Sequence, residues 1–225
     1  ERYTRLGPDH LDYEVTVDAD PQVGVETGDV AHPGRGSSGY VPIDRVSARA
    51  WAEADRVLAV TVPREVAASR PTVVRLRGLS AEKAAAGHVV VTAEAFSRAV
   101  VLLEHEGSAT FADNVEVVVH DGADLTLVTL HEWADDAVHL TQTQARVGRD
   151  AAYKHAAISF GGDLVRMDAN VTYGGPGGSA ELLGLYFADA GQHIEHRLFA
   201  DHDAPHTKSR VTYKGALQGQ RAHTV

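Results

Sequence analysis

The stretch Leu182–Gly219 has the sequence LLGLYFADAGQHIEHRLFADHDAPHTKSRVTYKGALQG, and its pattern decides the fold. Apolar residues recur in short alternating bursts, as at Leu183, Leu185 and Phe187, and glycine and aspartate residues separate the bursts. Alternation with a period of two is typical of β-strands that bury one face. The stretch therefore predicts consecutive short strands with these three apolar residues on the buried face.

Strand-like segments also run upstream of this stretch, beginning at His88, and turn-forming residues separate them. Almost no helix-like pattern interrupts the series, so we predict a mostly-β core over residues 86–225. The expected strands are 88–92, 99–104, 115–120, 125–130, 138–145, 153–160, 164–173, 180–187, 192–200 and 208–217.

A weak internal repeat indicates how these strands are arranged. The segments GADLTL, DAAYKH and SAELLG resemble one another, and their alanines, Ala123, Ala151 and Ala180, are 28 and 29 residues apart. One such unit cannot bury its own apolar face, but units stacked in register form a continuous core. The near-constant offset favours a β-solenoid. A β-sandwich fits the alternation equally well and is the competing fold.

Residues 1–85 form a separate N-terminal region with a single clear helix. Asp44 is the expected N-cap, and apolar residues follow it at helical spacing, which predicts a helix over about 44–57. The segment Ser80–Ala86 is also helix-like, although it is short. The domain division is therefore a small α/β part followed by the β core.

The overall charge argues against a nucleic-acid partner. The chain of 225 residues has 31 acidic and 21 basic residues, a formal net charge of −10, and no run of Lys or Arg. Phosphate binding needs a basic face, so nucleic acid is not an expected ligand. The chain has no cysteine, which excludes disulfides, thiolate metal sites and thiol catalysis, and which fits a cytoplasmic location.

The sequence shows neither a membrane span nor a signal peptide. Its longest purely apolar run is 99–103, whereas a membrane span needs roughly 18 residues. The chain begins at Glu1 rather than Met and ends at Val225 within a strand-like pattern. We therefore expect a piece of a longer protein, truncated at both ends.

Catalytic motifs are absent from the sequence. Gly34, Gly36 and Gly39 form a G-x-G-x-x-G, but no buried strand precedes it, so we interpret it as a loop rather than a dinucleotide site. No P-loop, H-E-x-x-H or G-x-S-x-G occurs. Asp135 and Asp136 are adjacent and would point to opposite faces of a strand, so they predict a solvated turn. No catalytic residue is assigned.

Histidine is the notable excess, with 13 residues in the chain. Five of them lie near the C-terminus: His193, His196, His202, His206 and His223. Their spacing does not place a pair on one strand face, which favours surface or turn histidines that make single hydrogen bonds. A transient contact with a metal or cluster is the alternative. No metal or cofactor ligand is assigned.

Several short motifs are spread along the chain. They are Pro42-Ile43-Asp44-Arg45, Val115-Glu116-Val117, Gly161-Gly162-Asp163-Leu164, Gly184-Leu185-Tyr186, Gln192, Asp201-His202, Pro205-His206-Thr207, Ser209 and Tyr213-Lys214-Gly215. Together they resemble the SufB/SufD family of iron–sulfur cluster assembly proteins. Within that family the chain is more similar to SufD, because SufB typically carries cysteines and this chain has none. One departure is Thr207, where SufD relatives often have cysteine.

The resemblance implies a right-handed parallel β-helix and a non-catalytic scaffold subunit of a SufBCD complex. The subunit pairs with SufB through the β-helix core and docks the SufC ATPase through a C-terminal region beyond Val225. An iron–sulfur cluster forms transiently on the full complex, and its ligands lie outside this chain, so none is carried over.

Two other functions remain open at this point. A β-helix carbohydrate-active enzyme would need acidic and basic side chains gathered along one face. A histidine-based metal-binding domain would use His193, His196, His202 or His206. On the scaffold interpretation, an exposed last turn also predicts homodimerisation through the core when SufB is absent.

Overall fold

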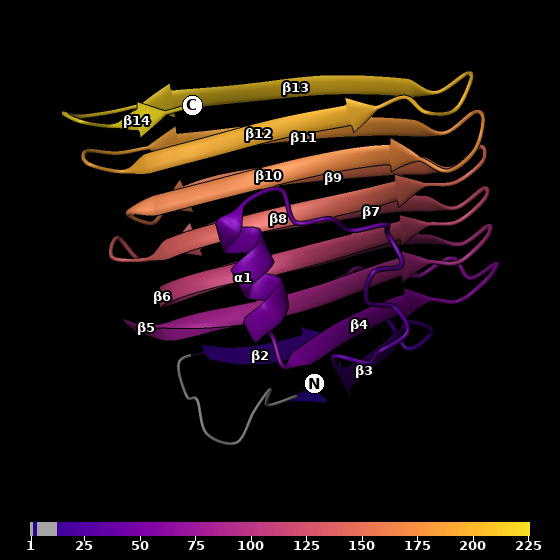
Figure 1. The fold of residues 1–225 in the computed structure, drawn as a ribbon, viewed down its shortest axis with the longest axis horizontal. Coiled ribbons are helices and arrows are strands. Elements are labelled where there is room, and N and C mark those ends of the chain that lie inside the picture. The colour runs from indigo at the N-terminus through magenta and orange to yellow at the C-terminus, as the bar shows by residue number, and fades with distance from the viewer. Residues whose placement is uncertain (1, 4–12) are drawn as a thin grey trace.

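The strands stack in parallel along one axis, as the repeat predicts (Figure 1). The computed structural model describes residues 2–3 and 13–225. Its strands are β1 (Arg2–Tyr3), β2 (Tyr13–Asp18), β3 (Gly24–Asp29), β4 (Arg56–Val62), β5 (Thr72–Ala93), β6 (Arg98–Val119), β7 (Asp124–Trp133), β8 (Val138–Val147), β9 (Ala152–Gly161), β10 (Leu164–Tyr173), β11 (Ser179–Ala188), β12 (His193–Asp201), β13 (Lys208–Leu217) and β14 (His223–Thr224).

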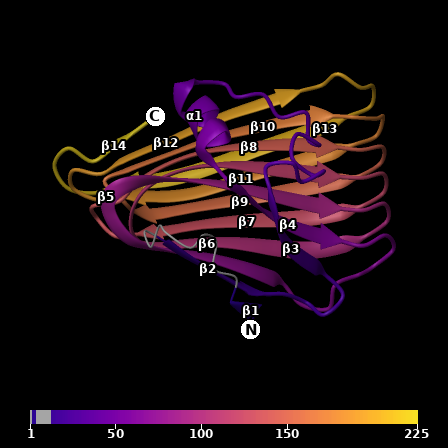
Figure 2. The ribbon, with the colours of Figure 1, turned by 60° about the horizontal axis from the view of Figure 1, so that its bottom comes forward.

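Each strand from β7 to β12 pairs with the strand two places further along the chain. The strands β7, β9, β11 and β13 form one sheet, and β8, β10, β12 and β14 form the other. The long strands β5 and β6 pass through both sheets. The two sheets enclose the interior from either side (Figure 2). The β-solenoid is therefore confirmed, and the parallel pairing of every second strand rules out a β-sandwich.

Three strands of the N-terminal region, β2, β3 and β4, cover the first end of the solenoid. The strand β2 pairs antiparallel with the first half of β5, and β4 pairs parallel with its second half. The strand β3 then pairs antiparallel with β4. These strands protect the edge of β5, which would otherwise present unpaired backbone groups.

Apolar side chains fill the interior at alternate positions of each strand. Among them Leu125, Leu127, Val165, Leu182 and Ile194 are fully buried. Burying such a side chain stabilises the fold by about 1.5–3 kcal/mol. The core thus depends on the stacking of successive turns.

The predicted buried face of β11 was wrong. Leu182 is buried, whereas Leu183 and Phe187 are partly buried on the outer side and Leu185 is 49% exposed. The reason is the close packing between turns: a Cβ atom at the inward-facing Gly184 would lie 2.0 Å from the ring of Tyr213. A tyrosine of the next turn therefore occupies the interior there, and the apolar residues face outward.

The repeat predicts the pairing between β7 and β9 correctly, but its second offset, from β9 to β11, is wrong. Leu125 pairs with Tyr153, as the 28-residue offset requires. Tyr153 in turn pairs with Ala180, so the equivalent of Ala151 is not Ala180. The spacing of Ala151 and Ala180 predicts an offset of 29 residues between β9 and β11, but the observed pairing is shifted from that alignment by two residues.

The helix α1 (Arg45–Glu53) begins where the sequence predicts. Asp44 is the N-cap and forms a capping box with Ser47. The predicted end at about residue 57 was too late, because the backbone leaves the helix at Ala54 and continues as β4. In Figure 1, α1 lies across the outer face of the sheet that contains β8. It is the one α-helix among the residues described.

The helix-like segment Ser80–Ala86 is part of the strand β5, so that prediction was wrong. Here β5 passes from one sheet to the other, and its pairing with β6 changes register between Ser80 and Ala84. Hydrogen bonding to β6 on both sides of the segment overrides its local preference. Because β5 runs through residue 86, the proposed division at 85/86 stays a prediction.

The glycine-rich loop binds a carboxylate of its own chain. The amides of Gly36 and Ser38 donate to the Glu116 carboxylate at 2.6 and 3.1 Å, and the Ser38 hydroxyl donates at 2.6 Å. His88 Nε2 lies 2.9 Å from the same carboxylate. The loop donors are thereby used to fasten the N-terminal segment to the solenoid.

Replacing Glu116 with alanine should destabilise the protein by about 3 kcal/mol, because it leaves several buried donors without a partner. Urea unfolding followed by circular dichroism measures the change. Glu132→Ala on the exposed side of β7 is the matched control and should change stability by less than about 0.5 kcal/mol. Equal effects of the two substitutions would contradict this role for Glu116.

Candidate functional site

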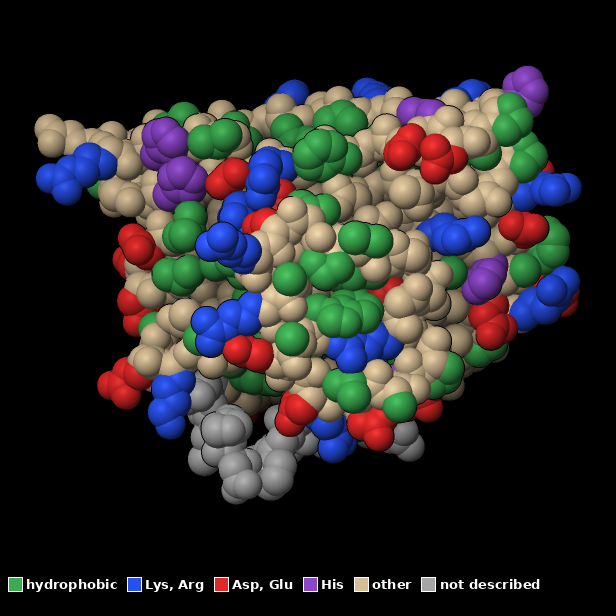
Figure 3. Space-filling view, in the orientation of Figure 1, with side chains coloured by type: hydrophobic (Ala, Val, Ile, Leu, Met, Phe, Trp, Pro, Cys, Tyr) green, Lys and Arg blue, Asp and Glu red, His purple; other side chains and the backbone are tan. Residues whose placement is uncertain are grey.

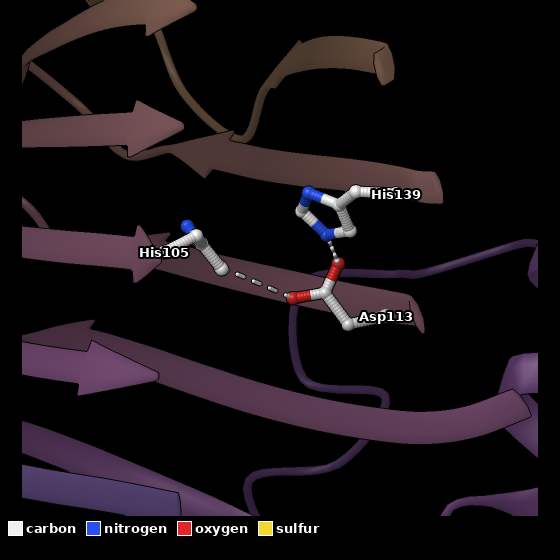
Figure 4. A group of neighbouring side chains, drawn as sticks. All are labelled: His105, Asp113 and His139. Carbon is white, nitrogen blue, oxygen red and sulfur yellow. Dashed lines mark hydrogen bonds and ion pairs between the residues drawn. The ribbon is translucent and has the colours of Figure 1, made fainter. Parts of the chain in front are cut away.

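A cluster of histidine and aspartate side chains lies inside the solenoid. One nitrogen of His105, one of His139 and one oxygen of Asp113 all lie within 4.8 Å of one another, and all three residues are buried. His105 and Asp113 belong to β6, and His139 belongs to β8. Figure 4 shows Asp113 between the two imidazoles.

The path of β6 places its two halves on opposite sides of the interior. His105 lies in the half that pairs with β7, and Asp113 lies in the half that pairs with β8. Gly107, between them, has φ of +83°, and a Cβ atom there would lie 2.3 Å from the carbonyl oxygen of Gly78. Glycine at this bend therefore lets one strand supply both His105 and Asp113 to one site.

Trp133 fixes the proton of His139. The indole Nε1–H can only donate, and it donates to His139 Nδ1 at 3.1 Å. The proton of neutral His139 is therefore on Nε2, which donates to Asp113 Oδ1 at 3.1 Å. The result is a buried chain of donors from Trp133 through His139 to the carboxylate.

His105 is neutral at neutral pH and faces the other carboxylate oxygen. Burial, together with the neighbouring His139, lowers the pKa of His105 to about 4. Its Nδ1 donates to the carbonyl oxygen of Leu130 at 3.3 Å. Its Nε2, which then has a free electron pair, lies 3.9 Å from Asp113 Oδ2, too far for a hydrogen bond.

Asp113 is an ionised carboxylate in the interior. Its side chain is 2% exposed, and burial alone would raise its pKa. The hydrogen bond that His139 donates, with smaller contributions from His105 and Thr141, outweighs burial and holds the pKa of Asp113 below its usual value. Buried anions are costly unless a cation or several donors compensate them, so this carboxylate is the electrostatic centre of the cluster.

A second polar chain continues along the interior. His131 Nδ1 lies 3.0 Å from the Ser159 hydroxyl, and His196 Nε2 lies 3.1 Å from the same oxygen. At neighbouring inward positions, the hydroxyl oxygen of Thr129 and the Nε2 of His155 are hydrogen-bonded at 3.1 Å. Nitrogens of His131, His155 and His196 have no hydrogen-bond partner among the described residues. The interior is thus lined by imidazoles beyond the cluster itself.

The five C-terminal histidines do not form one site. His193 and His223 stack with ring centroids 4.7 Å apart, and His202 bonds to hydroxyl groups of its own turn. His206 is exposed at a turn. These fit the surface and turn interpretation. His196 is different, because it faces the interior and bonds to Ser159.

The interior cluster was not found from the sequence. His105, His131 and His139 each occupy an inward position of an alternating strand, which is a detectable signal. Their meeting depends on the register and on the bend of β6, and the sequence does not show either. Asp135 and Asp136 do lie in a turn, as predicted.

The fold and the interior together define a class of protein: a parallel β-solenoid whose largely apolar interior also holds buried histidine and carboxylate side chains. Comparison with known proteins identifies the family. The SufBD core domain of the SUF system for iron–sulfur cluster assembly matches residues 76–225, and the chain belongs to this family.

Curated relatives agree with this assignment. An iron–sulfur cluster assembly SufBD family protein of Mycobacterium bovis is 46% identical over 211 residues, which is 94% of this chain and 53% of the relative. The corresponding protein of Mycobacterium leprae is 44% identical over 219 residues, which is 94% of this chain and 56% of the relative. The chain spans about half the length of the curated relatives it matches.

Protonation of the interior histidines should destabilise the fold in mild acid. Burial lowers the pKa of His155 and of His196 from 6.5 to about 4, with a further effect of His196 on His155. The unfolded chain then binds more protons than the folded chain between these values, so stability is full above pH 6.5 and falls as pH decreases towards 4. We expect a loss of about 2 kcal/mol per histidine between pH 7.5 and pH 5.

Urea unfolding at a series of pH values measures this dependence. The slope of the unfolding free energy against pH is set by the number of protons taken up on unfolding. His155→Gln should lower that number by about one, whereas His202→Gln on an exposed turn should leave the slope unchanged. A stability that is constant from pH 7.5 to pH 5 would contradict the neutral, buried state of these histidines.

Proposed function

We propose that this chain is the core of a non-catalytic scaffold subunit of a SufBCD complex, in which iron–sulfur clusters are assembled. The observation that carries the proposal is membership of the SufBD family, combined with a solenoid that exposes long, rigid sheet faces. In the proposed complex, the chain pairs with SufB and connects to the SufC ATPase through a region beyond Val225. The cluster is cargo that forms transiently on the complex.

One feature of the chain supports a SufD-type subunit, and one position departs from the SufD pattern. The chain has no cysteine, so it supplies no thiolate for sulfur transfer or cluster binding. At Thr207, where relatives often have cysteine, the hydroxyl lies 2.7 Å from His202 Nδ1 and donates to the carbonyl of Ala204. This position therefore serves to close a turn.

The outer face of the β9–β11 sheet supports pairing with another solenoid. Ile158 and Phe160 of β9 pair with Leu185 and Phe187 of β11, and all four point outward. Phe160 and Leu185 are exposed. A contiguous outward apolar surface on a regular sheet marks a protein interface more often than an isolated exposed residue does. We propose that this face contacts SufB and that two copies of the chain use it when SufB is absent.

Ion pairing on the opposite sheet counts against a carbohydrate-active enzyme. Asp168 Oδ1 lies 2.6 Å from Arg197 Nε, and Glu195 Oε1 lies 3.2 Å from the same atom. Arg166 pairs with Asp44 and Asp168. Glycoside hydrolysis needs a free acid and a free base or nucleophile, and these carboxylates are held by arginines.

The remaining surface agrees with a protein partner. On the face shown in Figure 3, basic and acidic side chains are interspersed.

No helix of the described part of the chain is long and apolar enough to cross a membrane. We propose a cytoplasmic location, which is where a cysteine-free assembly subunit would meet its partners.

Leu185→Lys should weaken co-purification with SufB at least tenfold, because it places a charge in the apolar interface. Ile43→Lys is the matched control, since Ile43 is a similarly exposed apolar residue on the segment before α1. Pull-down of SufB and SufC from the same source, with quantification of each subunit, measures the effect. Full binding by Leu185→Lys would contradict this interface, and no binding by the unsubstituted chain would contradict the proposed function.

A further inference from the structure

The interior cluster has an electron-rich position between His105 and Asp113. The Nδ1 of His105 donates to the Leu130 carbonyl, so the Nε2 of the neutral ring carries a free electron pair. That atom faces Asp113 Oδ2, which has electron pairs of its own, at 3.9 Å. Two acceptors of this kind attract a positively charged ligand between them.

The spacing suits a metal ion. Nitrogen and carboxylate ligands lie about 2.1 Å from a zinc-sized divalent ion, so a pair of ligand atoms can span up to about 4.2 Å across it. The observed 3.9 Å falls within this reach. A histidine ligand normally donates its other N–H to a carbonyl or carboxylate, as His105 does to Leu130.

His139 has a different role, which its tautomer decides. Because Trp133 donates to Nδ1, the Nε2 of His139 carries the proton and donates to Asp113 Oδ1. His139 therefore fixes the orientation of the Asp113 carboxylate by a hydrogen bond to Oδ1 and leaves Oδ2 facing His105. Residues that bond to metal ligands orient those ligands in the same way. The ring of His131 is 5.1 Å from that of His105, between centroids, and its Nε2 is buried without a partner among the described residues.

A small cavity borders the two ligand residues. Its volume is about 30 Å³, and both His105 and Asp113 line it. The rest of its lining is mostly apolar, with the polar residues Tyr13, Arg56, His88 and Glu104. This is room for about one water molecule or one ion beside the two ligand residues.

We propose that His105 Nε2 and the Asp113 carboxylate bind one divalent first-row transition-metal ion, with His139 as the residue that positions Asp113. Imidazole with carboxylate suits Fe²⁺, Co²⁺ and Zn²⁺. The site is built from this chain alone and does not require SufB or SufC. That the ion is Fe²⁺ in the cell rests on the proposed function, whereas divalent metal binding does not.

Anaerobic titration of the whole chain with Co²⁺ tests the proposal, with calorimetry for stoichiometry and visible absorption for the ligand set. We expect one ion per chain. Asp113→Asn and His105→Gln should each weaken binding at least tenfold, and His139→Gln should weaken it about tenfold through the orientation of Asp113. His155→Gln is the matched control, because it removes an equally buried imidazole outside the site and should leave the affinity unchanged.

A second control and a second measurement keep the test decisive. The double substitution His193→Gln and His223→Gln removes the stacked surface pair and should not change binding. Anomalous diffraction from Co²⁺-loaded crystals locates the ion without any substitution, so a variant that fails to fold does not obscure the result. The proposal is overturned by no Co²⁺ binding at millimolar concentration, by an ion on the surface pair, or by unchanged affinity in folded Asp113→Asn.

Discussion

The hydrogen bonding between successive parallel turns is the constraint on which the rest of this structure depends. Each strand from β7 to β12 pairs with the strand of the next turn, so no turn completes its backbone hydrogen bonds alone. The same register places equivalent side chains above one another in the interior, turn after turn. Any inward residue must therefore fit its neighbours in the turns before and after it.

This constraint explains both the apolar core and the polar cluster. Where the inward positions are apolar, as at Leu125 and Leu127, they pack and exclude water. Where they are polar, they bond to one another or to backbone groups, and Trp133, His139 and Asp113 form a connected chain. The arrangement leaves His105 Nε2 without a donor and creates the electron-rich position beside Asp113.

Much of the fold could be predicted from the sequence, because the alternation of apolar residues and the 28-residue repeat can both be read without knowledge of the structure. The phase of β11 could not, because LLGLYF has apolar residues on both sides and a tyrosine of the next turn decides which side faces inward. The segment Ser80–Ala86 has a helix-like pattern that only pairing with β6 overrides. The cluster depends on the register and on the bend at Gly107, which the sequence does not show, so the sequence points only to the histidines that lie close together near the C-terminus.

The same geometry relates the chain to its proposed role. A solenoid with a fixed register is rigid, and its outer faces repeat along the axis, so it can align a second solenoid over many turns. On β11, Leu185 and Phe187 face outward because Gly184 and Tyr186 take the inward positions. On β9, Ile158 and Phe160 face outward because the buried Ala157 and Ser159 take the inward positions. The outward apolar surface is thus a consequence of how the interior is packed.

Site-directed photo-crosslinking from position 185 tests whether this chain pairs with SufB through the β9–β11 face. A photoreactive amino acid replaces Leu185, and the complex with SufB and SufC is irradiated and analysed by mass spectrometry. We expect crosslinks to SufB, and crosslinks between two copies of this chain when SufB is omitted. Crosslinks to neither, in a complex that assembles normally, would contradict pairing through the β9–β11 face.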